Sequence, residues 1–118
     1  MLKLGLTSDL QLLVSLLKDA DEDTSRIAGV INDSANTAYL ALNAQQQVGA
    51  VVMHWHPQES EILYIAVNSA YRGQGYGKAC IDQIRNEARN RQVQSLIVGT
   101  ANSSLDNIAF YQKCGFRM

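Results

Sequence analysis

The sequence predicts an α/β domain with a mixed, mostly antiparallel sheet and flanking helices. Two observations carry this prediction: three strand-like runs follow one another over residues 37–67, and a strand–helix–strand unit occupies residues 61–100. A crossover of the usual hand makes the strands around Tyr64 and Leu96 parallel. The 118 residues are 47% hydrophobic and contain no visible linker or repeat. We therefore expect one domain, residues 1–118.

The N-terminal third is predicted to hold one strand and two helices. The segment "LKLGL", residues 2–6, is a short strand. Residues 8–20 carry leucine and valine at helical spacing, with Ser8 as the N-cap. The acidic segment "DEDTS" is interpreted as a solvated loop, after which residues 26–34 form a weaker second helix.

The middle of the chain is predicted to be three strands. The runs "TAYLALN" and "VGAVVMHWH", residues 37–43 and 48–56, are separated by "AQQQ", which indicates a hairpin with a slightly long turn. The run "EILYIAV", residues 61–67, follows Pro57 and is rich in β-prone side chains.

The C-terminal third is predicted to be a helix, a buried strand and a closing helix. These segments are "KACIDQIRNEARN", "VQSLIVGT" and "SLDNIAFYQKCG", at residues 78–90, 93–100 and 104–115. Gly115 is placed to end the last helix. Cys80 and Cys114 lie inside the two helical segments, which suits buried, reduced thiols better than a disulfide.

Composition and charge limit the kinds of binding partner and the cellular location that we expect for this protein. The net charge of −1 argues against a nucleic-acid binder that neutralises many phosphates. No run of about 18 apolar residues indicates a membrane span. The N-terminus lacks the basic and apolar regions of a signal peptide, so we expect a cytoplasmic protein.

The segment "VNSAYRGQGYGKACI" places three glycines between a strand and a helix. A helix N-terminus offers unpaired N–H groups and partial positive charge, and side chains at Gly73, Gly75 or Gly77 would keep a ligand from those groups. Arg72 and Lys78 add charge at the rim, so a diphosphate fits the turn. The alternative is a turn that only permits tight packing. A P-loop and a dinucleotide fingerprint both fit the spacing less well.

The segment "YRGQGYGKACI" resembles the acyl-CoA-binding signature of the GNAT superfamily of N-acetyltransferases, [Q/R]-x-x-G-x-[G/A], with Arg72, Gly75 and Gly77 in the defining positions. Upstream, "EILYIAV" is similar to the central strand of that family. Downstream, "NIAFYQKCGFRM" is similar to its closing helix. The resemblance covers residues 59–118 and implies a GNAT-like fold with acetyl-CoA as the acyl donor.

The resemblance implies how acetyl-CoA would be held. Its pantetheine arm would pair with backbone groups of the central strand, and its pyrophosphate would lie on the amides of the glycine turn. An asparagine ahead of the last helix would touch the arm, although a role as a turn or capping residue is the alternative for it. The implied cofactor-binding residues are Ile65, Ala66, Val67, Arg72, Gly73, Gln74, Gly75, Tyr76, Gly77, Lys78 and Asn102.

The resemblance also implies direct attack of an amine on the thioester. Tyr111 would protonate the departing thiolate, because family resemblance aims its phenol at the sulfur; a partly buried aromatic residue is the alternative. Glu61 would take the proton from the ammonium, directly or through water; an ordinary surface carboxylate is the alternative. Alternation places Glu61 on the same face as Leu63, Ile65 and Val67.

Two histidines flank Trp55 on the preceding strand. Alternation predicts that His54 and His56 share one face, where they could line the acceptor pocket. A metal pair is conceivable there, but no third ligand is evident, so we expect no metal site.

The family pattern continues with two further antiparallel strands after the point where this sequence reads "GFRM". Without them the strand around Leu96 would be a sheet edge, and we expect a homodimer that covers it. The leading interpretation is an N-acetyltransferase for a primary amine of a small molecule or peptide. The alternative is a non-catalytic acyl-CoA-binding or dimeric interaction domain, and a phosphate-binding module unrelated to acyl-CoA is a weaker third.

Overall fold

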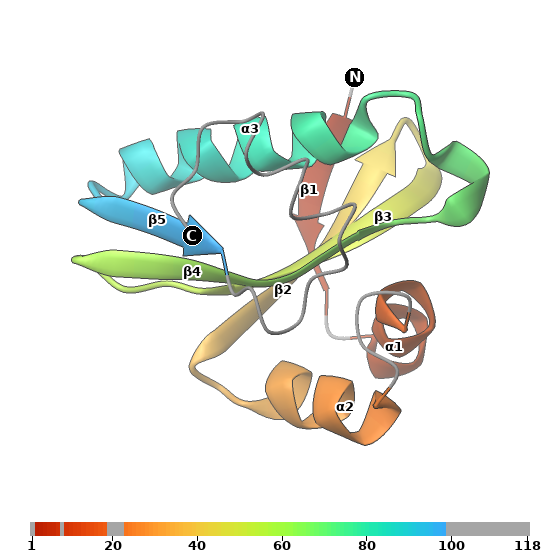
Figure 1. Ribbon diagram of the computed structural model, residues 1–118, viewed down its shortest axis with the longest axis horizontal. Helices are drawn as coiled ribbons and strands as arrows, with labels where there is room; N and C mark the ends of the chain where they lie inside the picture. Colours follow the sequence, from red (N-terminus) through yellow and green to blue (C-terminus); the bar gives the residue numbers. More distant parts are fainter. Residues whose placement is uncertain (1, 8, 19–22, 99–118) are drawn as a thin grey trace.

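The computed structural model describes residues 2–7, 9–18 and 23–98 as a twisted sheet with helices on both faces (Figure 1). Within these residues the strand order follows the chain: β1 (Leu2–Leu6), β2 (Asn36–Asn43), β3 (Gln46–His54), β4 (Glu59–Val67) and β5 (Ser95–Val98). Neighbouring strands are antiparallel except β4 and β5, which are parallel. The predicted mixed, mostly antiparallel sheet is confirmed.

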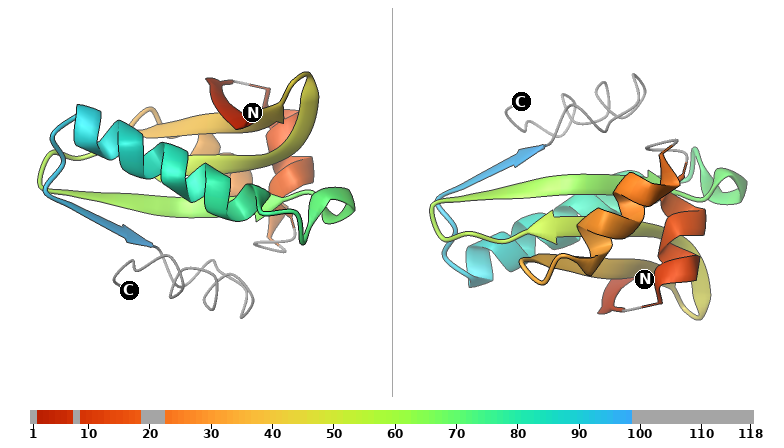
Figure 2. Two further views of the ribbon diagram at one scale, coloured as in Figure 1. Left: turned by 90° about the horizontal axis from the view of Figure 1, so that it is seen from above. Right: turned by 90° about the horizontal axis from the view of Figure 1, so that it is seen from below.

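Helix α3 (Tyr76–Asn90) covers one face of the sheet, and α1 (Leu10–Leu17) and α2 (Thr24–Asn32) cover the other (Figures 1 and 2). Alternation along β3 divides the core between the two faces. Val51 and Met53 join the buried cluster under α3, whereas Ala50 and Val52 join the cluster under α1 and α2. Since β3 is buried on both sides, it is the centre of the hydrophobic core. None of the described helices combines the length and apolarity needed to cross a membrane.

Two aspartates set the starts of the N-terminal helices. Asp9 accepts a hydrogen bond from the Leu12 N–H at 3.2 Å and is the N-cap of α1, so the prediction of Ser8 as N-cap is wrong. Ser8 itself lies outside the described residues. Asp23 accepts from the Arg26 N–H at 3.1 Å, and α2 therefore begins two residues before the predicted start. A carboxylate at this position satisfies an orphan amide and complements the helix dipole.

The hairpin between β2 and β3 is tighter than predicted. Asn43 pairs with Gln46, which leaves a turn of only Ala44 and Gln45. Ala44 adopts a φ of 58°, as residues in short hairpin turns often must. The prediction failed because Gln46 and Gln47 are exposed polar residues that nevertheless pair through their backbone.

The C-terminal elements agree with prediction except at their starts. Helix α3 begins at Tyr76, two residues before Lys78, because the Gly75 carbonyl already accepts the first helical hydrogen bond, from the Ala79 N–H. Strand β5 begins at Ser95 rather than Val93. The Val93 N–H donates a hydrogen bond to the Ala88 carbonyl at 2.9 Å, just after the end of α3, and so is not part of a strand ladder. The predicted closing helix, residues 104–115, lies outside the described residues.

A bulge interrupts β4. Val52 pairs with Tyr64 but Met53 pairs with Ile62, which leaves Leu63 without a cross-strand partner. As a result Leu63 and Tyr64 both pack toward α1 and α2.

The bulge overturns the predicted common face of Glu61, Leu63, Ile65 and Val67. Ile65 packs in the cluster under α3 together with Ile62. Glu61 neighbours Ile62 in a regular stretch of strand and therefore lies on the opposite face, with Leu63. Simple alternation cannot anticipate one inserted residue.

Gly49 gives a test of how closely β3 and β4 approach. A Cβ added there would overlap the Ala66 carbonyl oxygen and lie 3.2 Å from its carbon, and both are backbone atoms. We expect Gly49→Ala to lower the free energy of unfolding by about 1–3 kcal/mol.

Urea denaturation followed by circular dichroism measures this change. Gly29→Ala is the matched control, because Gly29 is an exposed helical residue with open space around an added Cβ. It should raise stability by about 0.5–1 kcal/mol. Equal effects from the two substitutions would contradict the close approach.

Candidate functional site

Strands β4 and β5 are paired over only part of their length. The parallel ladder runs from Glu59 with Ser95 to Ile62 with Val98. Beyond Ile62, β4 continues to pair with β3 as far as Val67, whereas the described part of β5 ends at Val98. Figure 2 shows the two strands starting together and diverging toward the glycine turn. Beyond Ile62, this backbone edge of β4 therefore has no strand neighbour among the described residues.

The backbone of β4 alternates between the two edges. The Ala66 carbonyl lies over Gly49 and so faces β3. The Val67 carbonyl accepts a hydrogen bond from Nε of Arg72 at 3.2 Å, on the opposite edge. Because successive residues of a strand direct their backbone groups to opposite edges, Ile65 and Val67 face the β5 side. The expectation that the Ala66 backbone also faces a ligand there is wrong for its carbonyl.

The glycine turn follows the end of β4 that extends beyond the described ladder with β5. After the short 3-10 helix η1 (Ser69–Tyr71), Gly73 and Gly75 adopt φ values of 80° and 82°, in the left-handed region that favours glycine. Gly75 is the N-cap of α3, and no heavy atom lies within 4 Å of a Cβ built at either glycine.

The backbone amides of the turn are unpaired in the described part of the chain. No oxygen there accepts a hydrogen bond from the N–H groups of residues 73–78, and the helical ladder begins with the Ala79 N–H on the Gly75 carbonyl at 3.0 Å. Six donors at a helix N-terminus, with open space over the glycines, can bind an anion.

The side chains of the turn contribute unequally. Lys78 lies at the rim with 67% of its side chain exposed, and its ion pair with Asp82 is long, at 3.8 Å. Such an exposed pair is weak, so the ammonium can turn to a bound phosphate. Gln74 is also exposed. Tyr76 instead turns into the fold, where its hydroxyl accepts from Nδ2 of Asn43 at 2.8 Å, so it can offer a ligand only its N–H.

A row of polar side chains crosses the sheet near the last parallel pair. The β-ladders place Asn36 opposite His54, and His54 opposite Glu61. Nδ1 of His54 lies 3.2 Å from Oδ1 of Asn36, and Glu61 is adjacent in β4 to Ile62, where the ladder with β5 ends. The row faces α1 and α2, since the neighbouring Met53 and Ile62 face α3. His54 and Glu61 are both partly exposed.

His56 does not join this row, so the predicted common face of the two histidines is wrong. Strand β3 ends at His54. The backbone of His56 forms a reciprocal pair of 2.9 Å hydrogen bonds with the buried Ser60 hydroxyl, and its ring accepts from the Gln58 N–H at 3.2 Å. These bonds hold the turn before β4. Among the described residues no three His, Cys, Asp or Glu side chains are grouped to hold a metal.

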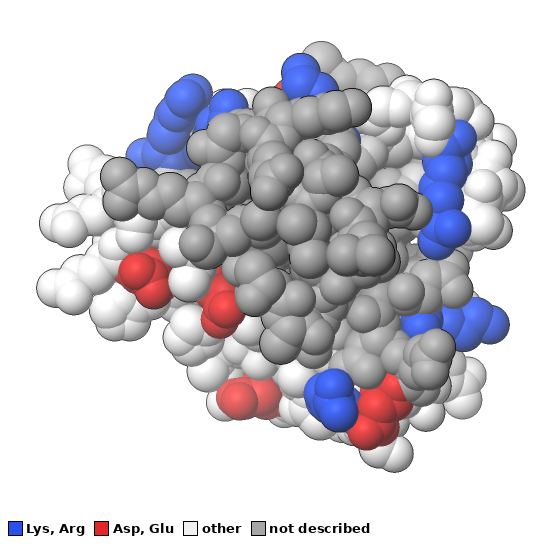
Figure 3. Space-filling view, in the orientation of Figure 1, with Lys and Arg blue, Asp and Glu red and all other residues white. Residues whose placement is uncertain are grey.

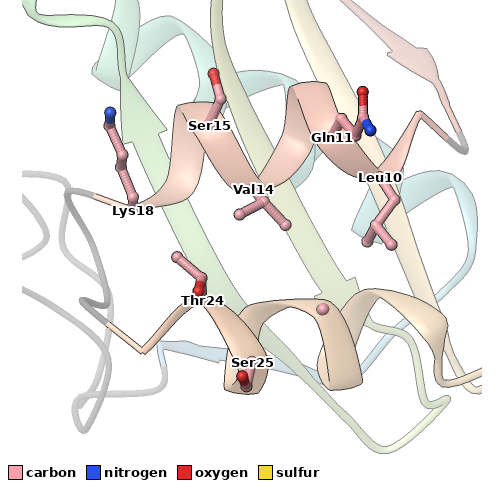
Figure 4. Close-up of a pocket in the computed structure, with 8 residues that line it drawn as sticks. Leu10, Gln11, Val14, Ser15, Lys18, Thr24 and Ser25 are labelled. Carbon is pink, nitrogen blue, oxygen red and sulfur yellow. The ribbon is translucent and has the colours of Figure 1, made fainter.

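A separate hollow of about 530 Å³ lies between α1 and α2 (Figure 4). Val14 and Leu10 line it from α1, and Lys18 is the charged side chain of its described lining. The described part of the face in Figure 3 carries both basic and acidic side chains around its border.

Two predicted site residues, Tyr111 and Asn102, lie outside the described residues, as does Cys114. Sequence reasoning missed Asn36 as the partner of His54, and Gly49 as the point of close approach to β4. The sequence could have indicated Gly49, because an isolated glycine inside a strand is typical of a bulge or a close backbone contact. It could not have indicated Asn36, because the contact of Asn36 with His54 depends on the strand register.

Comparisons with known proteins agree with this geometry. The model of the acetyltransferase (GNAT) family matches residues 9–116. An uncharacterized N-acetyltransferase of Bacillus subtilis, YvbK, is 35% identical over 68 residues, which are 58% of this chain and 44% of that protein. A second Bacillus subtilis protein, YxbD, is 28% identical over 77% of this chain and 57% of its own length. The chain thus spans about half the length of these curated relatives.

Solved structures match nearly the whole chain. The IAA acetyltransferase from Bacillus cereus is 31% identical with a TM-score of 0.83, over 100% of this chain and 78% of that one. A GNAT family acetyltransferase from Elizabethkingia anophelis, solved with acetyl-CoA bound, is 28% identical with a TM-score of 0.83, over 99% and 76% of the two chains. A Bacillus subtilis acetyltransferase in complex with CoA is 29% identical with a TM-score of 0.79, over 98% and 75%.

The thiol of Cys80 tests whether the core under α3 excludes solvent and thiol reagents. Cys80 is fully buried, and burial raises the pKa of its thiol from 9.0 to about 12. We expect native Cys80 to resist a thiol-specific reagent at pH 8 and to react once urea unfolds the chain. A Cys114→Ser background isolates this thiol.

The raised pKa of Cys80 also predicts how the stability of the fold changes with pH. The unfolded thiol ionises near pH 9.0 and the folded one near 12. The contribution of this thiol to the free energy of unfolding is therefore full below pH 9 and declines as the pH rises toward 12.

In the labelling experiment, rapid reaction of native Cys80 at pH 8 would contradict the burial.

Proposed function

Because the chain belongs to the acetyltransferase (GNAT) family, we propose that it binds acetyl-CoA and transfers the acetyl group to a primary amine of a small molecule or peptide. The observation that carries the proposal is the run of N–H groups at residues 73–78 that have no hydrogen-bond acceptor among the described residues, shortly after the end of β4. This arrangement suits a ligand with a diphosphate at one end and an extended, amide-containing arm.

The proposed binding mode places one end of acetyl-CoA on the glycine turn and its extended arm along β4. The pyrophosphate would accept hydrogen bonds from the turn, with Arg72 and Lys78 at its rim. The pantetheine arm would lie along β4, where Ile65 and Val67 direct backbone groups to the β5 side. From Val67 to Ile62 the strand spans about 16 Å at 3.3 Å per residue, so the thioester would be carried toward the last parallel pair. Solved relatives that hold acetyl-CoA or CoA support this mode.

The proposed reaction is direct transfer. The acceptor ammonium loses a proton to Glu61, directly or through water. The neutral nitrogen then attacks the thioester carbon, so that a C–N bond forms and the C–S bond breaks. Tyr111 supplies the proton that converts the leaving thiolate to CoA thiol, and the second nitrogen proton, lost as the amide forms, restores the Tyr111 phenol. Glu61 supports this role through its place beside the end of the β4–β5 ladder and through its partial exposure.

The homodimer and the cytoplasmic placement expected from the sequence are kept as proposals. Sedimentation at micromolar concentration would test the first, and a stable monomer would contradict it.

Substitution at Gly75 tests the anion cradle. Gly75→Glu places a strained, negatively charged residue at the φ of 82° beside the amides. We expect affinity for acetyl-CoA to fall by more than about 100-fold, because like charges at a binding site cost several kcal/mol. Calorimetry with acetyl-CoA, CoA and ATP measures the binding and separates acyl-CoA recognition from general phosphate binding.

Gly29→Glu is the control, since it adds the same charge at an exposed helical glycine far along the chain from the turn. Undiminished binding by the Gly75 variant would rule out the cradle. Binding of acetyl-CoA without thiol release for any amine would instead indicate a non-catalytic acyl-CoA-binding domain.

Two carboxylates on one strand test the proposed base. Glu59 and Glu61 are two residues apart in β4 and both pair with β5, opposite Ser95 and Ile97. We expect Glu61→Gln to lower kcat/KM by about 100-fold with little change in affinity for acetyl-CoA, and Glu59→Gln to leave both nearly unchanged. Thiol release across an amine panel, with calorimetry, measures the two quantities. Equal losses in both variants would argue against a specific role for Glu61.

A further inference from the structure

The amide of Asn36 is held in one orientation. Its Nδ2 donates to the Val30 carbonyl at 2.9 Å, near the end of α2, and its backbone N–H donates to the Asp33 carbonyl at 3.0 Å. A carbonyl can only accept, so the Nδ2 group must face Val30. Oδ1 is thereby turned to the other side, where it lies 3.2 Å from Nδ1 of His54.

This orientation decides which nitrogen of His54 carries the proton. Oδ1 of Asn36 can only accept, so Nδ1 of His54 must donate. In the neutral imidazole the lone pair is then on Nε2. The ring has no other hydrogen-bond partner among the described residues. Asn36 therefore acts on His54 as a tautomer lock.

Glu61 is the carboxylate in register with this ring. Residues directly opposite in an antiparallel pair have Cβ atoms about 4.5–5.5 Å apart and share one face. An imidazole can accept a proton near neutral pH, whereas a carboxylate is a weaker base that gains from a second acceptor. Partial exposure of His54 gives the proton a route to solvent.

We propose that His54 is the relay residue that receives the acceptor's proton from Glu61, in the tautomer fixed by Asn36. The inference rests on the proposed acetyl transfer. The ammonium gives one proton to the Glu61 carboxylate, which passes it to Nε2 of His54 and returns to its ionised form. The resulting imidazolium releases that proton to solvent, so one proton leaves per acetyl group transferred, and the C–N and C–S bond changes are those given above.

The described residues of the flanking elements supply few other titratable groups. Glu61 and Glu59 lie on β4, Asp33 ends α2, and His56 follows in the loop. Asp33 already accepts from the Ala35 N–H at 2.9 Å, and His56 is engaged in its own turn. The in-register partner is Glu61.

The test compares two matched substitutions. Asparagine places an amide where Nδ1 of histidine lies, so His54→Asn keeps a donor to Asn36 but lacks Nε2, and His56→Asn keeps an acceptor for the Gln58 N–H. We expect kcat/KM of the wild type to fall at acid pH, where proton removal from the acceptor is opposed. His54→Asn should lower kcat/KM at pH 7.5 by about 10- to 100-fold and should lose that acid limb. His56→Asn should change neither.

Two further measurements keep the outcomes distinct. Nitrogen-15 NMR of the wild type should show the Nδ1–H tautomer for His54, and calorimetry should show unchanged acetyl-CoA binding by the His54 variant. An Nε2–H tautomer, or an acid limb that persists in His54→Asn, would overturn the relay while leaving acetyl transfer intact. Failure of the wild type to release thiol from acetyl-CoA for any amine would overturn the proposed function, and the relay with it.

Discussion

The parallel pairing of β4 with β5 is the constraint on which the rest of the structure depends. β4 pairs with β3 up to Val67, and within the described residues its ladder with β5 runs from Glu59 to Ile62. Parallel neighbours require a crossover, and α3 supplies it by starting beyond the far end of β4 and returning across the sheet (Figure 1). The N-terminus of α3 therefore lies next to the C-terminal end of β4. Topology thus brings together the end of β4 and the helix amides that have no partner among the described residues.

The bulge at Leu63 serves this constraint in two ways. It follows directly after Ile62, the last residue of the parallel ladder, and a bulge bends its strand and increases the local twist. It also changes which residues face which layer, so that Ile65 packs under α3 while Glu61, just before the bulge, faces α1 and α2. One inserted residue thus bends β4 just beyond Ile62, and Glu61 faces away from the core under α3.

Sequence periodicity predicted the order and type of the described elements, because each has a clear apolar face. The glycine turn was equally readable, since Gly73 and Gly75 occupy backbone conformations that other residues rarely adopt. The bulge could not be predicted from the sequence, because Leu63 and Tyr64 are both apolar and fit either register. His56 looked like a strand residue, but buried hydrogen bonds to Ser60 decide its turn. The contact between Asn36 and His54 joins residues 18 apart and exists only through strand register.

The proposed function gives the two ends of β4 opposite electrostatic tasks. The turn at residues 73–78 would attract a diphosphate, whereas Glu61 would attract an ammonium without weakening the binding of the phosphates. From Glu61 to Val67 the strand spans about 20 Å, more than twice the screening length of about 8 Å at physiological ionic strength. Phosphate binding is therefore little weakened by the carboxylate, and the ammonium senses Glu61 more strongly than the distant phosphates. A single extended strand keeps the two charges apart and still joins them through a ligand that lies along its edge.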